Sequence, residues 1–251
     1  MTDRGWALVT GGSRRIGRAL ALAAAGAGHD IIIHARSATQ ADEAAQAVRR
    51  QGRRAEILVA DLADPAACAG LIAAAPAPLT LLVNCASRFA DDRIENLVVE
   101  DWDATLATNL RAPVLLAQAF AAALPRGREG LIVNIVDQRV WRLTPHFFSY
   151  TISKAALWAA TQTLAQALAP RIRVNAIGPG PTLASTHQSR AQFAAETAAV
   201  PLGRGASPDQ IGEALRYLID APSVTGQMIA VDGGQHLAWR TPDVETDPAH
   251  G

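Results

Sequence analysis

Short apolar runs alternate with Ala- and Leu-rich helical segments along almost the whole chain. The runs are too short to span a membrane, and several are rich in Val and Ile, which favours buried strands. They are Trp6 to Val9, Asp30 to Ala35, Glu56 to Ala60, Leu79 to Val83, Leu131 to Val136, Ile172 to Ile177 and Met228 to Val231. Strands buried on both faces and separated by crossover helices predict a doubly wound α/β domain with a parallel sheet.

The segments between these runs have helical patterns with recognisable ends, such as Pro65 in a first turn and Gly52 after a last one. The predicted helices are Ile16 to Ala25, Thr39 to Arg50, one that starts at Pro65, Glu100 to Leu124, Tyr150 to Leu168 and Pro208 to Ile219. No repeat or interdomain linker interrupts the pattern. We expect one domain over residues 1–240 and a polar, disordered tail over residues 241–251.

The charge balance and the cysteines limit the kinds of partner that we expect this chain to bind. Lys and Arg number 23 and Asp and Glu number 23, so electrostatics gives no case for a nucleic-acid or membrane-surface partner. Cys68 and Cys85 lack metal-ligand spacing, which favours reduced thiols and no metal site. The sequence shows no signal-peptide pattern and no membrane-spanning run, so we expect a cytoplasmic protein.

A glycine-rich turn joins the first strand to the first helix. Glycines let the backbone approach a pyrophosphate, and the helix N-terminus offers free N–H groups and a positive dipole end. The alternative is a tight turn without a ligand, but the position after the first strand and the neighbouring arginines favour a phosphate site. The predicted contacts are Gly11, Ser13, Arg14, Arg15, Ile16 and Gly17.

The end of the second strand bears on the choice of cofactor. Domains that bind NAD usually place an acidic residue there for the ribose hydroxyl. This chain has Arg36 and Ser37 instead, a cation and a hydroxyl that suit the 2′-phosphate of NADP. A solvated surface arginine is the alternative reading.

Tyr150 and Lys154 are the strongest catalytic signal. Their i, i+4 spacing puts them on one face of a helix that follows the fifth strand. A nearby ammonium favours the phenolate, so we expect Lys154 to lower the pKa of Tyr150 toward the working pH. Tyr150 would then act in proton transfer, and Lys154 could also hold the nicotinamide ribose.

Together these motifs resemble the short-chain dehydrogenase/reductase family over Ala7 to Leu237. The turn resembles its Thr-Gly-x-x-x-Gly-x-Gly fingerprint, with Arg15 in place of the middle glycine. The resemblance implies one Rossmann domain with seven parallel strands, NADP(H) as cofactor, a homotetramer, and Asn109 as a proton-relay residue. It also implies further cofactor contacts at Asp61, Leu62, Asn84, Ala86, Ser87, Tyr150, Lys154, Pro179, Gly180 and Thr182.

Several departures from the general family pattern resemble the pteridine reductase and dihydromonapterin reductase branch. That branch also has Arg, Ser, Phe and Asp at the positions of Arg15, Ser87, Phe89 and Asp137. In it the Phe stacks on the pterin ring, and the Asp replaces a catalytic Ser. The resemblance implies NADPH-dependent reduction of a dihydropterin C=N bond. The substrate-binding residues would be Arg15, Ser87, Phe89, Asp137 and Tyr150.

Two other functions stay open at this point. One is a general carbonyl or 3-oxoacyl reductase, in which a protonated Asp137 does the work of the serine. The other is a non-catalytic NADP-binding regulatory protein, which Asn109, Tyr150 and Lys154 argue against. Phe89 could instead be a core aromatic. We expect residues 181–201 to form the substrate loop, with His187 a solvated loop residue.

Overall fold

The computed structural model describes residues 4–185 and 188–239. One parallel seven-stranded sheet runs through it in the order β3-β2-β1-β4-β5-β6-β7, which confirms the predicted fold class. The strands are β1 Trp6–Thr10, β2 Asp30–Ala35, β3 Ala55–Val59, β4 Leu79–Asn84, β5 Gly130–Ile135, β6 Ile172–Pro179 and β7 Met228–Val231. The strand order reverses between β1 and β4, where an open α/β sheet leaves a crevice for a ligand.

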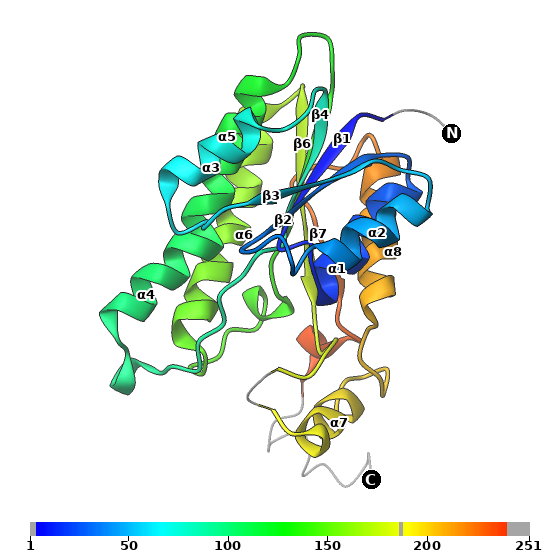
Figure 1. Ribbon diagram of the computed structural model, residues 1–251. Helices are drawn as coiled ribbons and strands as arrows, with labels where there is room; N and C mark the ends of the chain where they lie inside the picture. Colours follow the sequence, from blue (N-terminus) through cyan, green and yellow to red (C-terminus); the bar gives the residue numbers. More distant parts are fainter. Residues whose placement is uncertain (1–3, 186–187, 240–251) are drawn as a thin grey trace, which may run out of the picture.

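Helices cover both faces of the sheet (Figure 1). One face carries α1 Arg15–Gly26, α2 Asp42–Arg50 and α8 Pro208–Asp220. The other carries α3 Pro65–Ala73, α4 Val99–Leu106, α5 Ala112–Ala123 and α6 Phe148–Leu168. Each face has its own apolar cluster, and the residues of β1 alternate between them: Ala7 and Val9 belong to one, Trp6 and Leu8 to the other. The inner strands are therefore buried on both faces, as their apolar runs predict, whereas the edge strands β3 and β7 are partly exposed.

Two segments differ from the expected pattern. The long helix expected over Glu100 to Leu124 is interrupted by a π-helical turn, η2 Ala107–Arg111, between α4 and α5. The expected substrate loop contains a helix, α7 Arg190–Ala198. A reciprocal capping box starts α7: the Ser189 hydroxyl accepts the Gln192 N–H at 3.2 Å, and the Gln192 side chain accepts the Ser189 N–H at 2.8 Å.

Some expectations fall on residues that the structure does not describe. His187 and the tail over residues 241–251 lie outside the described residues, so the domain boundary stays a prediction. Within the described part, no helix combines the length and the apolar character that a membrane span needs. The same part contains no cluster of three or more His, Cys, Asp or Glu side chains arranged to hold a metal ion.

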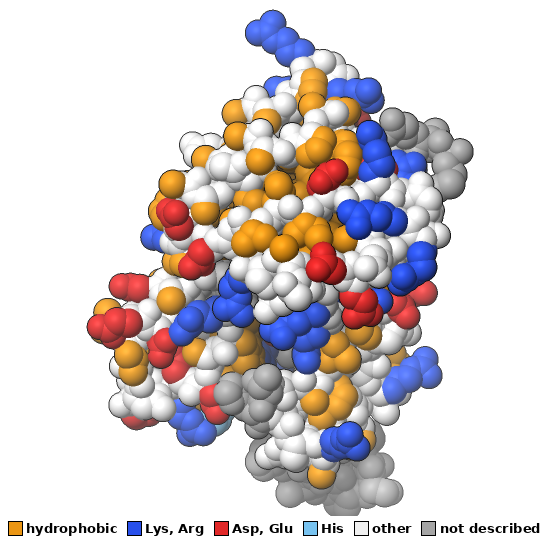
Figure 2. Space-filling model, in the orientation of Figure 1, with side chains coloured by type: hydrophobic (Ala, Val, Ile, Leu, Met, Phe, Trp, Pro, Cys, Tyr) orange, Lys and Arg blue, Asp and Glu red, His pale blue; other side chains and the backbone are white. Residues whose placement is uncertain are grey.

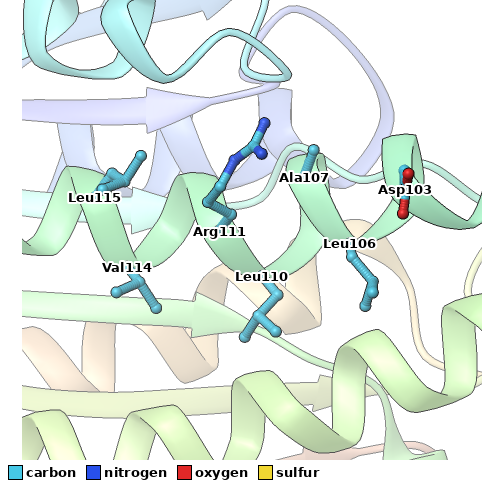
Figure 3. Close-up of a pocket in the computed structure, with 7 residues that line it drawn as sticks. All are labelled: Asp103, Leu106, Ala107, Leu110, Arg111, Val114 and Leu115. Carbon is cyan, nitrogen blue, oxygen red and sulfur yellow. The ribbon is translucent and has the colours of Figure 1, made fainter.

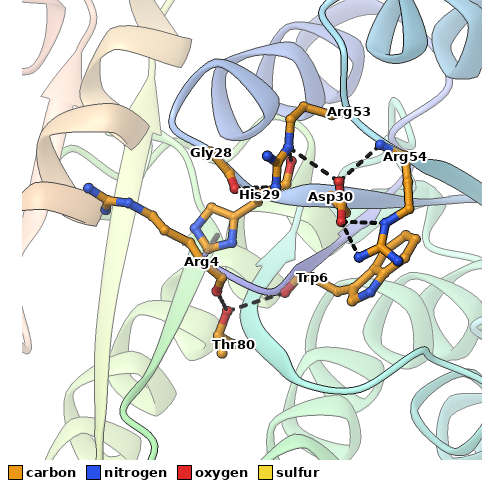
Figure 4. Close-up of polar contacts among 8 residues, drawn as sticks. All are labelled: Arg4, Trp6, Gly28, His29, Asp30, Arg53, Arg54 and Thr80. Carbon is orange, nitrogen blue, oxygen red and sulfur yellow. Dashed lines mark hydrogen bonds and ion pairs between the residues drawn. The ribbon is translucent and has the colours of Figure 1, made fainter. Parts of the chain in front are cut away.

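A charged cluster closes the amino edge of the sheet, at the opposite end of the strands from the glycine-rich turn (Figure 4). The Asp30 carboxylate accepts the Arg54 backbone N–H at 2.9 Å and the Arg54 Nε–H at 2.7 Å. Arg53 Nε lies 3.2 Å from the same carboxylate. Although burial raises the pKa of Asp30, these two arginines hold it below its usual value. The Arg54 guanidinium also covers the Trp6 ring at 4.8 Å.

We expect Asp30→Asn to lower the free energy of unfolding by about 1–3 kcal/mol, because it removes the charge from buried, charge-assisted hydrogen bonds. Urea unfolding measures the loss. Asp220→Asn is the matched control, since its ion pair with Arg4 is exposed and worth at most about 1 kcal/mol. Equal losses in the two variants would contradict the role of the buried cluster.

Candidate active site

The candidate residues meet at the carboxyl edge of the sheet, because parallel strands deliver all of their carboxyl ends to one side. The turns after β1 and β2 carry the exposed Arg14, Arg15 and Arg36. Figure 2 shows Lys and Arg side chains gathered beside a hollow in the middle of the face that it presents. A basic rim around a crevice attracts an anionic ligand.

The glycine-rich turn is packed too closely to admit side chains at two positions. A Cβ atom on Gly17 would lie 2.1 Å from the Gly11 carbonyl oxygen. A Cβ atom on Gly11, whose φ is +64°, would lie 3.0 Å from the Ala86 Cα atom. The Thr10 hydroxyl accepts the Cys85 and Ala86 N–H groups at 2.9 and 3.1 Å. The turn after β1 is therefore fastened to the turn after β4.

His34 is a part of this site to which the sequence pattern assigned no role. Its buried imidazole accepts the Gly11 N–H on Nδ1 at 3.2 Å and donates from Nε2 to the Ala60 carbonyl at 3.1 Å. The His34 carbonyl accepts the Gly12 N–H at 3.1 Å. This pair of bonds requires the neutral ring with its proton on Nε2. Burial lowers the pKa of His34, against the opposing effects of the Ala60 carbonyl and Asp61.

We expect the stability of the protein to fall on acidification because of His34. Its folded pKa is lowered, so the unfolded chain binds the proton first as the pH falls below about 6.5. The stabilisation by the neutral ring is therefore complete above that pH and is lost toward the lower folded pKa, by up to about 1.4 kcal/mol per pH unit. Urea unfolding between pH 7.5 and 5 should show a smaller slope in His34→Gln than in the wild type.

The exposed His146 supplies the matched control for that slope. His146→Gln removes an imidazole that has no buried hydrogen-bonding role, so its stability should follow the wild-type pH dependence. If the free energy of unfolding of His34→Gln depended on pH as steeply as that of the wild type, protonation of His34 would not destabilise the folded state.

Asn84 and Asn109 hold the loops beneath the site. The Asn84 amide donates to Asn134 Oδ1 at 2.8 Å across neighbouring strands. Asn109 lies in the π-helical turn, accepts the Arg88 N–H at 2.7 Å and donates to the Arg88 carbonyl at 2.9 Å and to the Ser153 hydroxyl at 3.0 Å. Among the described residues, its hydrogen bonds thus run to the loop after β4 and to α6, not to Tyr150 or Lys154. Its relay role stays a prediction.

Tyr150, Asp137 and Lys154 form the reactive centre. The Tyr150 hydroxyl donates to Asp137 Oδ2 at 3.0 Å, and Asp137 Oδ1 accepts the Arg139 N–H at 2.9 Å. Lys154 Nζ lies 5.6 Å from the centre of the Tyr150 ring and donates to the Ile135 carbonyl at 2.7 Å. The structure therefore brings together the acid after β5 and the tyrosine and lysine of α6, as the sequence predicts.

The expected lowering of the Tyr150 pKa is wrong for this arrangement. Burial, followed by the charge and the hydrogen bond of Asp137, raises the pKa of Tyr150 well above its usual value. Burial also raises the pKa of Asp137, although Arg139, Tyr150 and Lys154 oppose it. Burial lowers the pKa of Lys154 to about 8. The Asp137 carboxyl group, which accepts the hydrogen bond of the phenol, and not the Lys154 ammonium, is therefore the main electrostatic neighbour of Tyr150.

An aromatic wall stands over this centre. The Phe89 ring meets Tyr150 edge to face at 4.7 Å and Phe147 at 4.6 Å, and the Arg139 guanidinium lies 5.0 Å from the centre of Phe147. Phe89 is only partly buried and borders a groove of about 590 Å³ along the loop after β4. It is therefore not enclosed in a core, which favours a ligand-facing role.

Asp92, which has no motif around it, fastens this wall to α6. Its carboxylate accepts the Ser149 N–H at 3.1 Å and the Ser149 hydroxyl, and its carbonyl accepts the Phe148 N–H at 3.1 Å. The residue before α6, Phe147, has a φ of +53° and gives no side-chain cap. An acid from another loop thus caps the helix that carries Tyr150, a partnership that only the tertiary structure reveals.

The other predicted cofactor residues line the same edge. A Cβ atom on Gly180 would lie 2.6 Å from the Asp232 Cα atom, and the Thr182 hydroxyl donates to the Gly180 carbonyl at 3.0 Å. Leu62 is buried in the apolar cluster, whereas Asp61 accepts the Ala63 N–H at 2.9 Å. The remaining ones lie on the exposed or partly buried turn surfaces or, for Pro179, at the end of β6: Ser13, Ile16, Ser37, Ser87 and Pro179. Their contacts with a cofactor stay predictions.

A second groove, of about 480 Å³, lies away from these residues along α4, η2 and α5 (Figure 3). It is lined by Asp103, Leu106, Ala107, Leu110, Arg111, Val114 and Leu115. None of the predicted catalytic or cofactor-binding residues lines it. The groove therefore belongs to the outer surface of the helical layer and not to the chemistry at the sheet edge.

Comparison with known proteins gives this geometry a family. The family model described as enoyl-(acyl carrier protein) reductase matches residues 11–236. A 3-oxoacyl-[acyl-carrier-protein] reductase of Synechocystis is 31% identical over 236 residues, covering 91% of this chain and 95% of that protein.

Two solved structures are more similar. FolM alternative dihydrofolate reductase 1 of Brucella suis, in complex with NADP, is 48% identical with a TM-score of 0.92, and the match covers 97% of this chain and 99% of that one. Its Brucella canis counterpart, also complexed with NADP, is 47% identical with a TM-score of 0.90 and the same coverage. With the parallel sheet, the glycine-rich turn and the Tyr150–Lys154 pair in place, the chain belongs to the short-chain dehydrogenase/reductase family and is one of its oxidoreductases.

Proposed function

We propose that this chain reduces the C=N bond of a dihydropterin, such as dihydromonapterin or dihydrofolate, with NADPH as the hydride donor. The observation that carries the proposal is the 3.0 Å hydrogen bond from Tyr150 to Asp137, at the position where the general family pattern has a serine. The similarity to two FolM alternative dihydrofolate reductases supports the same branch.

The residues present fit the cofactor. Gly11 packs against Ala86, and Gly17 packs against Gly11, so the turn after β1 has room only for backbone at these two glycines, as a pyrophosphate site needs. Asn84 Oδ1 is buried without a hydrogen-bond partner in the described part of the chain, so a polar acceptor remains at the end of β4. No carboxylate ends β2, and Arg36 stands there instead. The expected NADP(H) is also the cofactor complexed with both similar structures.

We expect NADPH to be preferred over NADH by about ten- to a hundred-fold in kcat/KM, and Arg36→Ala to remove most of the preference. A charge-assisted contact with the 2′-phosphate contributes roughly 1.5–3 kcal/mol, which corresponds to that ratio. Steady-state rates with both cofactors measure it. Arg50→Ala, at the exposed end of α2, is the matched control. Equal use of NADH by the wild type would contradict the assignment.

Charge development distinguishes the two candidate reactions. Reduction of a ketone builds negative charge on oxygen, which an ionised Asp137 would repel. Reduction of a C=N bond needs a proton on nitrogen, and a cationic, protonated imine accepts hydride more readily. An acid whose pKa is raised by burial holds a proton closer to neutral pH than an ordinary Asp does. Asp137 can thus resupply Tyr150, or stabilise the cation as a carboxylate.

In this proposal bound NADPH supplies the hydride, and the chain positions and protonates the substrate. Tyr150 delivers the proton to the ring nitrogen. Asp137, itself held by the Arg139 N–H, is the proton source behind Tyr150. Lys154, held by the Ile135 carbonyl, keeps a positive charge beside the pair and would hold the nicotinamide ribose. Phe89 supplies a flat apolar face for a pterin ring.

A general carbonyl or 3-oxoacyl reductase is the second candidate. The observation that favours it is the match to a family model and to a curated relative, both described as reductases of acyl-carrier-protein substrates. In that reaction Asp137 would be protonated and would donate a hydrogen bond to the carbonyl oxygen.

Replacing Asp137 separates the two reactions. We expect Asp137→Ser to lose about a hundred-fold or more of kcat/KM for 7,8-dihydromonapterin or dihydrofolate, the usual effect of removing a general acid. Activity on a 3-oxoacyl thioester should stay or rise, because a serine hydroxyl can donate to the oxyanion. NADPH oxidation measures both, and Tyr150→Phe is the control that should disable both. Wild-type enzyme that ignores dihydropterins but reduces 3-oxoacyl thioesters would establish the second candidate.

The proposal includes a cytoplasmic homotetramer by family resemblance, with no nucleic acid, membrane or metal involved. Support for self-association comes from the groove along α4, η2 and α5, which Leu106, Val114 and Leu115 line with partly exposed apolar side chains.

A further inference from the structure

Arg15 occupies a backbone position that suits glycine. Its φ is +51°, in the left-handed region that L side chains rarely adopt. The family fingerprint has glycine at this place, so the arginine replaces the residue for which the conformation carries no penalty. A non-glycine residue held in such a conformation points to a function for its side chain.

The Arg15 side chain fastens two loops together. Its Nη2 group donates to the Leu183 carbonyl at 3.2 Å and to the Ala184 carbonyl at 2.9 Å. Arg15 begins α1 at the end of the glycine-rich turn, whereas Leu183 and Ala184 follow β6. One side chain thus joins the segment after β1 to the segment after β6, both at the carboxyl edge of the sheet.

The segment that Arg15 holds is linked onward to the far wall of the site. The Gln188 amide donates to Glu196 of α7 at 2.7 Å, and the Gln235 amide donates to the same carboxylate at 3.4 Å. Next to Gln235, the His236 ring packs against Trp141, which ends the turn after Asp137, at 4.9 Å. Leu183 and Ala184 are therefore held to the cofactor turn, while Gln188 and α7 are linked through Gln235 and His236 to Trp141.

We propose that Arg15 is a positioning residue that fastens Leu183 and Ala184, which follow β6, to the cofactor turn. The inference rests on the proposed function only for its effect on pterin binding; the fastening itself rests on the two hydrogen bonds of Arg15. It assigns to Arg15 a role besides the direct contact with a pterin that the family pattern implies. Loss of the fastening should weaken substrate binding, because the chain must then order the loop on binding.

Hydrogen exchange of the ligand-free enzyme tests the fastening. Asn tolerates the left-handed region but is too short to reach Leu183 and Ala184, so Arg15→Asn removes the contact and preserves the turn. We expect about ten-fold faster amide exchange in residues 183–185 and in α7, with an unchanged Tm. Arg14→Asn, which removes a neighbouring exposed arginine without these bonds, is the matched control and should exchange like the wild type.

Kinetics with NADPH and a dihydropterin give the second readout. In Arg15→Asn the KM for the pterin should rise at least five-fold, with kcat within about three-fold of the wild type. Unchanged exchange in the ligand-free variant would overturn the fastening role, even if the pterin KM rose through loss of a direct contact. Faster exchange in an enzyme that reduces no dihydropterin would support the fastening and reject the proposed substrate.

Discussion

The parallel sheet imposes the constraint on which the site depends. Seven strands deliver their carboxyl ends to one edge, and both faces of the sheet are occupied by helices. Polar side chains at the strand ends must then satisfy one another within that edge. Thr10 and His34 do so with backbone groups of the turns after β4, β1 and β3, and the Asn84 amide does so with the Asn134 side chain. These bonds hold the loops around the crevice at set separations.

The reactive centre differs from these paired polar groups, because it brings ionisable side chains together. Asp137, Tyr150 and Lys154 are ionisable groups that lie close together. Burial shifts the pKa of each in the direction that favours its neutral form. An apolar trio would be easier to bury at the same place. The Arg139 N–H holds Asp137, and the Ile135 carbonyl holds Lys154. Asp92 anchors the start of α6, the helix that carries Tyr150. The surrounding structure thus imposes an arrangement that the three side chains would not adopt by themselves.

Sequence reasoning works for features with a local or periodic signature. The apolar runs locate all seven strands, and the spacing of Tyr150 and Lys154 places both on one helix face. It fails where the partner comes from a distant segment. Nothing around Asp92 predicts that it caps α6, and nothing around His34 predicts the Gly11 and Ala60 bonds. For the same reason, spacing predicts a lowered pKa for Tyr150 when the structure raises it. The spacing reveals Lys154 but not the burial of the phenol or its contact with Asp137.

Two departures from the general family pattern, Arg15 and Asp137, have the same physical character. Arg15 adopts a backbone conformation that is roughly 1–2 kcal/mol unfavourable for an L residue, where glycine would be relaxed. Asp137 puts a carboxyl group in a partly buried place where serine would be neutral. Each substitution is locally unfavourable. Each side chain also makes a contact at the carboxyl edge of the sheet, Arg15 with the segment after β6 and Asp137 with Tyr150. Local rules are broken most often at functional sites. Because the general family pattern has glycine and serine at these two places, the joint replacement supports the proposed dihydropterin, whose ring nitrogen needs a proton source such as Asp137.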